Sequence, residues 1–110
     1  RLVTPNKACE MFFLGETIDA AEAERLGIVN QVVAPEELEA ATMQLAERLR
    51  AAPPIALAAA KHAVYMSQSA ELEEMLRYET EVQLRCFESD DCHEGVQAFL
   101  EKREPKFTGH

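Results

Sequence analysis

The chain of 110 residues is long enough for one small domain or for a piece of a larger one, and its core must be thin. Its formal net charge of -9 argues against general attraction to nucleic acid, because phosphates call for a basic surface. Hydrophobic residues make up 47%, but no apolar run approaches the roughly 20 residues that span a bilayer. We therefore expect a soluble, cytoplasmic protein with no nucleic-acid or membrane partner.

The first residues and the cysteines add two expectations. The sequence opens at Arg1 without a tag, signal peptide or disordered lead-in, which we interpret as the mark of a fragment. Cys9, Cys86 and Cys92 are odd in number, which favours reduced thiols in a cytosol-like compartment. Cys86 and Cys92 with His93 lack a fourth ligand and a known spacing, so we predict no metal site.

Two short helices are predicted near the beginning of the chain. Thr4 is suited to cap a first helix that ends at Gly15. Asp19 followed three residues later by Glu22 has the form of a capping box, and Gly27 supplies a stop. Both helices must therefore be brief.

The stretch from Ile28 to Val33 is the only β-branched run in the sequence. β-branched side chains favour extended backbone, so this run is the one plausible strand. Because a single strand needs a sheet to join, we expect it to depend on a sheet from outside this chain.

Four helical segments are predicted after this point. Apolar residues recur at steps of three and four, and prolines or capping residues separate the segments. The last helix is capped by Ser89 and has Val96, Phe99 and Leu100 on its apolar side. The tail is expected to dock through Phe107. The four segments run from Pro35 to about residue 50, from residues 53 and 54 onward, from about residue 70 to 87, and from Ser89 to before Pro105.

Four motifs in the correct order resemble the enoyl-CoA hydratase/isomerase, or crotonase, family. Residues 13–23 read FLGETIDAAEA and look like the family's "LTG…I.A.EA" segment, and residues 26–33, LGIVNQVV, look like "GLVN.VV". Pro53 with Lys61 looks like "P.A…AK". Residues 89–107 look like the terminal "S.D..EG..AF.EKR.P.F" signature. Four linked motifs are far more specific than one short pattern.

The resemblance implies the carboxyl-terminal part of a crotonase-like α/β fold. Residues 1–34 would end its spiral core with two helices and a short strand, and residues 35–110 would form a helical oligomerisation and coenzyme A contact region. The fold class expected for the chain itself is mainly α, with at most one or two short strands. The partners implied are the upstream core, an acyl-CoA substrate and further copies of the protein, as a trimer or a dimer of trimers.

The family's chemistry depends on groups upstream of the segment that resembles Arg1 and Leu2. Two glutamates act there as general base and acid, and two backbone amides hold the thioester oxygen. We therefore assign no catalytic residue to this chain and expect it to be inactive alone. No cofactor is implied, since coenzyme A is part of the substrate.

Lys102 and Phe99 are the candidate coenzyme A contacts. By resemblance, the "EKR" lysine reaches the adenine and phosphate end of a coenzyme A that is bound mainly by a neighbouring subunit, and Phe99 packs beside the adenine ring. The competing interpretations are a solvated helix-end lysine that favours the helix dipole, and a core aromatic on the apolar stripe.

Other notable residues receive structural interpretations. Gly95 in a helix interior is expected to permit close packing, because glycine costs about 1 kcal/mol there relative to alanine. Glu79 lies on an apolar face and is expected to be a buried ion-pair partner of Arg77, Arg85 or an interface cation, rather than an acid or base with a raised pKa. His62 and His93 are expected at the surface or an interface.

Two functional classes remain open at this stage. The first is part of an enzyme of acyl-CoA metabolism, with hydration of a 2-enoyl-CoA ahead of double-bond isomerisation. The second is a non-catalytic crotonase-like module for oligomerisation or partner binding. Fold analogy does not choose among reactions on the same scaffold.

Overall fold

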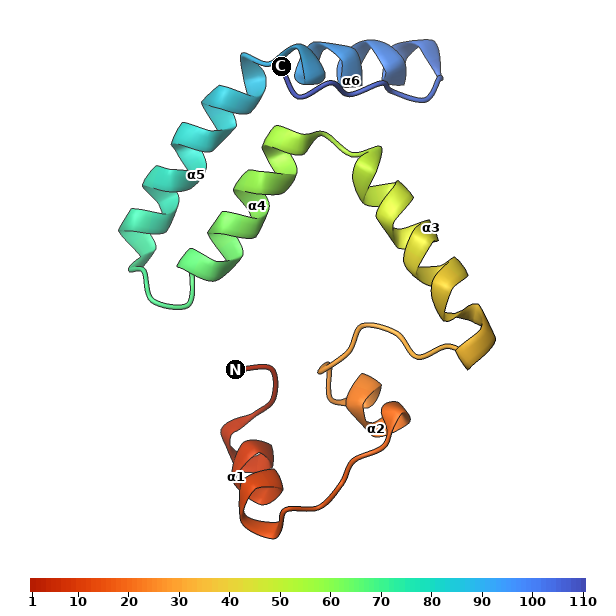
Figure 1. Ribbon diagram of the computed structural model, residues 1–110. Coiled ribbons are helices and arrows are strands. Elements are labelled where there is room, and N and C mark those ends of the chain that lie inside the picture. Colours follow the sequence, from red (N-terminus) through yellow and green to blue (C-terminus); the bar gives the residue numbers. More distant parts are fainter. The chain divides into compact units, whose positions relative to one another are not determined.

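The computed structural model describes all residues, 1–110, as a chain of helices without a strand (Figure 1). It divides into two compact units, residues 1–43 and 44–110. The mainly helical prediction is confirmed. The helices in chain order are α1 (Pro5–Leu14), α2 (Ala20–Arg25), the 3-10 turn η1 (Pro35–Glu37), α3 (Leu38–Arg50), α4 (Pro54–Met66), α5 (Leu72–Phe87) and α6 (Asp90–Glu101).

In residues 1–43 the two short helices begin and end where the capping residues predict. The Thr4 hydroxyl accepts a hydrogen bond from the Lys7 amide at 3.4 Å, and α1 stops at Gly15, which is left-handed with φ 63°. The Asp19 carboxylate accepts from the Glu22 amide at 2.8 Å and so begins α2. These side chains satisfy amides that lack a partner inside the helix.

The strand predicted for residues 28–33 is not formed within this chain. These residues are bends and irregular backbone. The Val32 amide donates to the Glu24 carboxylate at 2.8 Å, and the Ile28 amide donates to the carbonyl of Ala23 at 2.9 Å. Extended backbone needs a neighbouring strand for its hydrogen bonds, and no second strand exists here.

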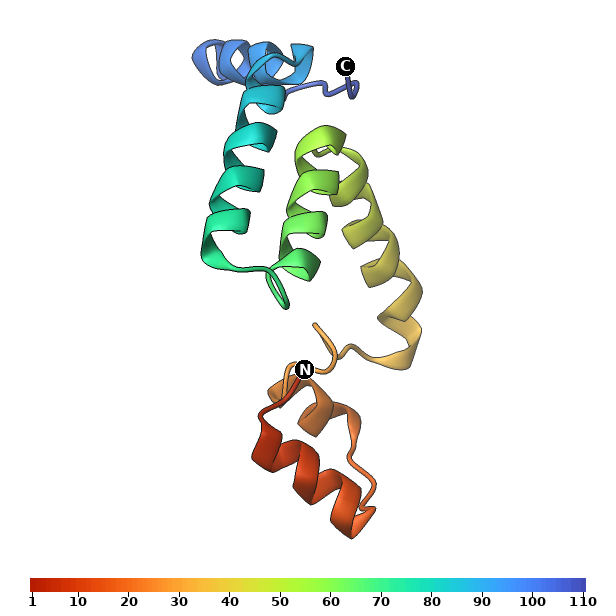
Figure 2. The ribbon, with the colours of Figure 1, turned by 90° about the vertical axis from the view of Figure 1, so that its left-hand side faces the viewer.

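In residues 44–110, α4 and α5 lie side by side as an antiparallel pair (Figures 1 and 2). The Tyr78 hydroxyl on α5 donates to the Ala59 carbonyl on α4 at 3.2 Å. The rings of His62 and Tyr78 have centroids 5.0 Å apart. The small alanine side chains of α4 allow this close approach.

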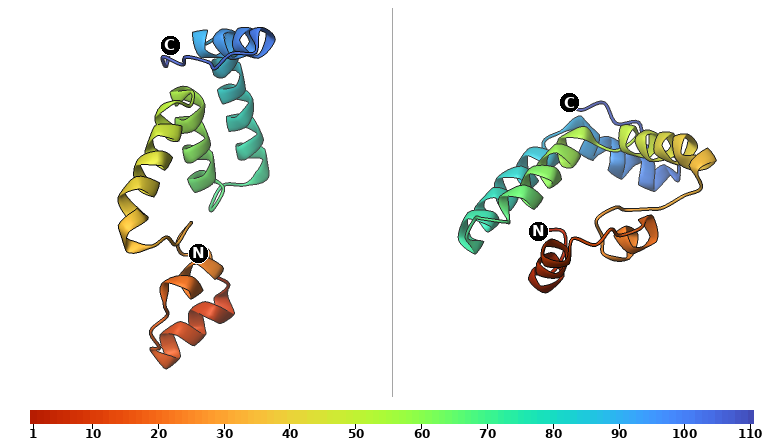
Figure 3. Two further views of the ribbon diagram at one scale, coloured as in Figure 1. Left: turned by 90° about the vertical axis from the view of Figure 1, so that its right-hand side faces the viewer. Right: turned by 60° about the horizontal axis from the view of Figure 1, so that its bottom comes forward.

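A tight junction connects α5 to α6, and the tail then returns along α6 (Figure 3). The buried hydroxyl of Ser89 donates to the Cys86 carbonyl at 2.7 Å and accepts from the Cys92 amide at 3.2 Å. The Phe107 ring lies 3.6 Å from the point where a Gly95 Cβ would stand. The predicted docking of Phe107 is confirmed, but an alanine Cβ at position 95 would meet its ring at an ordinary van der Waals distance, so the ring does not require glycine there.

Little of the apolar surface is buried within the chain. Ala98 is the one buried hydrophobic residue, at 1% exposure. Val96, Phe99 and Leu100, the predicted apolar side of α6, are all exposed, because the tail covers a different side of the helix. No helix has the length and apolarity that crossing a bilayer requires. The predicted division at residue 34, between spiral core and helical region, remains a prediction.

Candidate functional site

The candidate site begins with the turn that ends α6. The Arg103 amide donates to the Ala98 carbonyl at 3.0 Å, and the Lys102 amide donates to the Phe99 carbonyl at 3.3 Å. This pair of bonds defines a Schellman turn, in which the residue after the helix is left-handed and usually glycine. Here it is Lys102, with φ 55° and ψ 43°, the only residue other than glycine with positive φ. A side chain in this conformation costs roughly 1–2 kcal/mol.

The two cations at this turn have different surroundings. Lys102 is exposed, and its ammonium makes no hydrogen bond or ion pair within the chain. Arg103 is engaged by two carboxylates. The Lys102 ammonium is therefore an unpaired positive charge exposed to solvent, and the hydrogen bonds of the turn fix the backbone that carries it.

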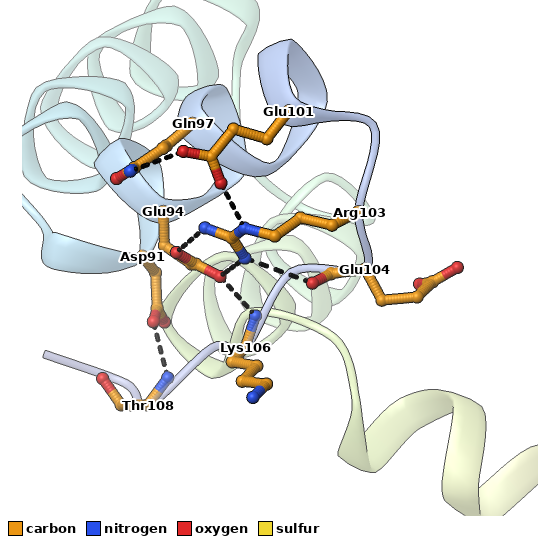
Figure 4. Close-up of polar contacts among 8 residues, drawn as sticks. All are labelled: Asp91, Glu94, Gln97, Glu101, Arg103, Glu104, Lys106 and Thr108. Atoms are coloured by element: carbon orange, nitrogen blue, oxygen red, sulfur yellow. Dashed lines mark hydrogen bonds and ion pairs between the residues drawn. The ribbon is translucent and has the colours of Figure 1, made fainter.

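Arg103 lies at the centre of a polar network (Figure 4). Two of its guanidinium nitrogens donate to the Glu94 carboxylate at 2.6 and 2.8 Å, and its Nε donates to Glu101 at 2.6 Å. The Glu94 carboxylate also accepts from the backbone amide of Lys106 at 2.7 Å. Paired, planar bonds of this kind fix geometry as well as charge.

The network shifts the titration of its members. The hydrogen bonds from Arg103, and then the bond from the Lys106 amide, lower the pKa of Glu94 to about 2. Hydrogen bonds from Arg103 and then Gln97 lower the pKa of Glu101. The pKa of Arg103 is raised, chiefly by Glu94. Both carboxylates therefore stay ionised at neutral pH.

A second carboxylate fastens the end of the tail to the start of α6. Asp91 is 4% exposed, and one of its oxygens accepts from the Thr108 amide at 2.6 Å (Figure 4). Its other oxygen accepts from the Gly109 amide at 3.0 Å. A buried charge needs such partners. Asp91 and Glu94 together hold residues 106–109 against α6.

Phe99 faces an apolar groove of about 470 Å³ in residues 44–110. It is 83% exposed, because no element of this chain covers that side of α6; its interpretations as an adenine contact and as a core aromatic both stay predictions. Other residues lining the groove include Ile55, Cys86, Val96, Leu100 and Phe107. Phe99 and Lys102 are three residues apart at the same end of α6.

The remaining predicted residues do not join this site. Glu79 is exposed and makes no ion pair within this chain, so the predicted buried pairing with Arg77 or Arg85 is wrong, while pairing with an interface cation stays a prediction. His62 is exposed beside the Tyr78 ring, and His93 is exposed with its Nδ1 3.1 Å from the Ser89 carbonyl oxygen.

The cysteines are free thiols, with Cys9 exposed and Cys86 and Cys92 half-buried. No group of three or more histidine, cysteine, aspartate or glutamate side chains is arranged to hold a metal ion.

The sequence reasoning missed the roles of Asp91, Glu94 and Arg103. In the sequence, Asp91 indicates only a negative charge in the first turn of a helix, where it favours the dipole. Glu94 and Arg103 are nine residues apart, a spacing that does not bring two side chains together on a continuous helix. The one signal in the sequence was Pro105, which predicts that the chain turns away shortly after the helix.

The comparisons place the whole chain among one set of proteins. Residues 1–110 match the sequence model of a family described as enoyl-CoA hydratase/isomerase. The chain is 36% identical to a carnitinyl-CoA dehydratase of Salmonella arizonae, over 100% of this chain and 44% of that protein. It is 39% identical to a probable enoyl-CoA hydratase of Mycobacterium leprae, over 98% of this chain and 42% of that protein.

Solved structures agree with these sequence matches. An enoyl-CoA hydratase of Bacillus anthracis superposes with a TM-score of 0.93 at 34% identity, covering 100% of this chain and 43% of its own. An enoyl-CoA hydratase subunit of Geobacillus kaustophilus superposes with a TM-score of 0.90 at 45% identity, covering 99% and 42%. The chain thus spans less than half the length of these relatives.

Proposed function

Because the chain belongs to the enoyl-CoA hydratase/isomerase family, we propose that it serves as the carboxyl-terminal part of an enzyme that adds water to a 2-enoyl-CoA. The names of its relatives support this choice, since they include a probable enoyl-CoA hydratase and a crotonyl-CoA hydratase. The general base, general acid and oxyanion amides of that reaction belong to the region upstream of residue 1. This chain contributes binding and assembly.

In this proposal Lys102 binds a phosphate at the nucleotide end of the acyl-CoA. The observation that carries it is the free ammonium of Lys102 on a left-handed turn, where glycine would be less strained. A solvated lysine that merely favours the helix dipole gains nothing from that conformation. A compact cation at a fixed position suits a phosphate.

Phe99 lies beside the adenine ring in the same proposal. Its ring is 83% exposed and lines the apolar groove, and Phe99 precedes Lys102 by three residues at the end of α6. A flat apolar ring next to a free cation is a suitable surface for a base joined to phosphates. The other exposed apolar faces serve the upstream core and further copies of the protein, as a trimer or a dimer of trimers.

The experiment is the substitution Lys102→Ala in the intact enzyme. A contact at the nucleotide end acts equally in the ground and transition states, so KM for the acyl-CoA should rise more than kcat falls. Losing one solvent-exposed phosphate contact costs on the order of 1 kcal/mol of binding free energy. We therefore expect a several-fold rise in KM that becomes smaller as salt is added.

The control is a pantetheine thioester, which lacks the nucleotide. Lys102→Ala should leave its KM unchanged. If the substitution impairs this truncated substrate as severely as the full ester, Lys102 is a structural residue and the assignment to the nucleotide end is wrong. Lys61→Ala serves as a matched exposed lysine on α4 and should affect neither substrate selectively.

A further inference from the structure

The Glu94 carboxylate binds the segment that directly follows Lys102. It binds the side chain of Arg103 through two hydrogen bonds and the backbone amide of Lys106 through a third. Arg103 directly follows Lys102 and supplies the amide that closes the turn on the Ala98 carbonyl. The position of Arg103 therefore determines the backbone at Lys102.

The turn needs such a restraint because lysine does not favour it. Left-handed backbone brings the Cβ of any L residue close to its carbonyl oxygen, so a lysine persists there only when its surroundings hold it. Figure 4 shows the restraint: the guanidinium of Arg103 lies between Glu94 and Glu101 while the chain loops around it.

The same contacts decide which cation is free. Two acidic side chains near the turn, Glu94 and Glu101, each form an ion pair with Arg103. Neither carboxylate is then left to pair with the Lys102 ammonium. Glu94 remains ionised at neutral pH, since the Arg103 and Lys106 hydrogen bonds hold its pKa at about 2.

We propose that Glu94 is a positioning residue for the nucleotide end of the acyl-CoA. By binding the Arg103 side chain and the Lys106 amide, it keeps Lys102 in the left-handed conformation and leaves its ammonium free for a phosphate. This inference rests on the proposed function. It assigns to Glu94 a contribution to substrate binding that acts through Lys102, without any contact to the substrate.

The test is a double-mutant cycle in the intact enzyme with Glu94→Gln and Lys102→Ala. Glutamine keeps the size of the side chain but loses the charge that holds Arg103. Alone, Glu94→Gln should raise KM for the acyl-CoA several-fold, leave kcat nearly unchanged and leave the pantetheine thioester unaffected. In the Lys102→Ala background it should raise KM no further, because residues that act through one contact are not additive.

Glu22→Gln is the matched control. Glu22 also binds an arginine through two hydrogen bonds, both 2.6 Å long and made to Arg25, but it lies on α2 beside no left-handed lysine. It should leave the KM for both substrates unchanged. Arg103→Lys is a second test, because lysine keeps the charge but does not form the paired bonds, and it should reproduce the selective rise in KM. Thermal unfolding of each variant confirms that folded enzyme is compared.

The outcomes separate the two proposals. If Lys102→Ala is selective for the nucleotide ester but Glu94→Gln and Arg103→Lys are not, the positioning role is overturned and the proposed function stands. An additive effect of Glu94→Gln in the Lys102→Ala background also overturns it. If Lys102→Ala itself lacks selectivity, the nucleotide contact is wrong and the positioning role falls with it.

Discussion

Three helices of this chain are followed by a left-handed residue, which is glycine after α1 and α2 but lysine after α6. Helix α1 ends at Gly15, with φ 63°, and its amide donates to the Met11 carbonyl at 3.1 Å. Helix α6 ends at Lys102, with φ 55°. Glycine adopts this conformation without strain, whereas lysine does not. Glycine at the end of α1 fits the backbone conformation there. Lysine at the end of α6 does not, so the backbone conformation does not explain why lysine occupies that position.

The surroundings of the two turns explain how the strained one persists. Nothing lies within 4 Å of the point where a Gly15 Cβ would stand, so that turn is held by its own backbone. The turn at Lys102 is held by Arg103, which two carboxylates bind. Strain that is supported in this way is typical of functional sites. The lysine side chain at this turn is therefore the candidate for a functional contact.

The largest expected effect is on hydratase activity, because neither helix end carries a catalytic group. Residues 1–110 alone should not hydrate crotonyl-CoA, since the proposed carboxylates and oxyanion donors lie upstream. Loss of the conjugated thioester absorbance is the measurement. Turnover above background that survives repurification would refute the assignment of the catalytic groups. The intact enzyme under the same conditions is the positive control.

An exchange of the two turn residues should change stability in opposite directions. Lys102→Gly removes the strain and should raise the free energy of unfolding by roughly 1 kcal/mol, whereas Gly15→Lys adds strain and should lower it by about as much. Urea unfolding of the intact protein measures both.

A Cβ at position 15 would meet no atom beyond its chain neighbours within 4 Å, so the strain of Gly15→Lys arises from its own backbone. Gly15→Ala, with the same Cβ and no charge, is therefore its control. The comparison fails if Lys102→Gly is as destabilising as Gly15→Lys, since the lysine would then be contributing stability rather than binding.

The smallest expected effect is on the pH dependence of stability. The pKa of Glu94 is about 2 in the folded chain against an ordinary 4.5, so the folded state favours the ionised form. Its contribution is fully present above pH 4.5 and is lost as the pH falls toward 2. The pKa of Glu22 on α2 is also lowered, chiefly by Arg25.

Carbon-13 NMR of labelled glutamate carboxylates measures these titrations in the intact protein. Glu94→Gln should remove the steepest loss of stability between pH 4.5 and 2, and Glu22→Gln provides the matched comparison. An ordinary titration of Glu94 near 4.5 would mean that Arg103 does not hold it in solution.

The sequence predicted most of the local structure because local structure depends on neighbouring residues. Thr4, Asp19 and Ser89 cap helices through their own side chains, and all three do so in the structure. The structure that the sequence does not decide locally depends on distant partners. Residues 28–33 lack a second strand, and the apolar sides of α5 and α6 lack a covering surface, which leaves Glu79 and Phe99 exposed.

By itself the sequence determined the helices, their caps, the family and the two candidate contacts, Lys102 and Phe99. Only the tertiary structure decided that Lys102 is left-handed, that Arg103 is taken up by Glu94 and Glu101, and that Asp91 holds the tail. These contacts form because the tail folds back along α6. That return brings together residues nine to eighteen positions apart, and no local pattern in a sequence records such contacts.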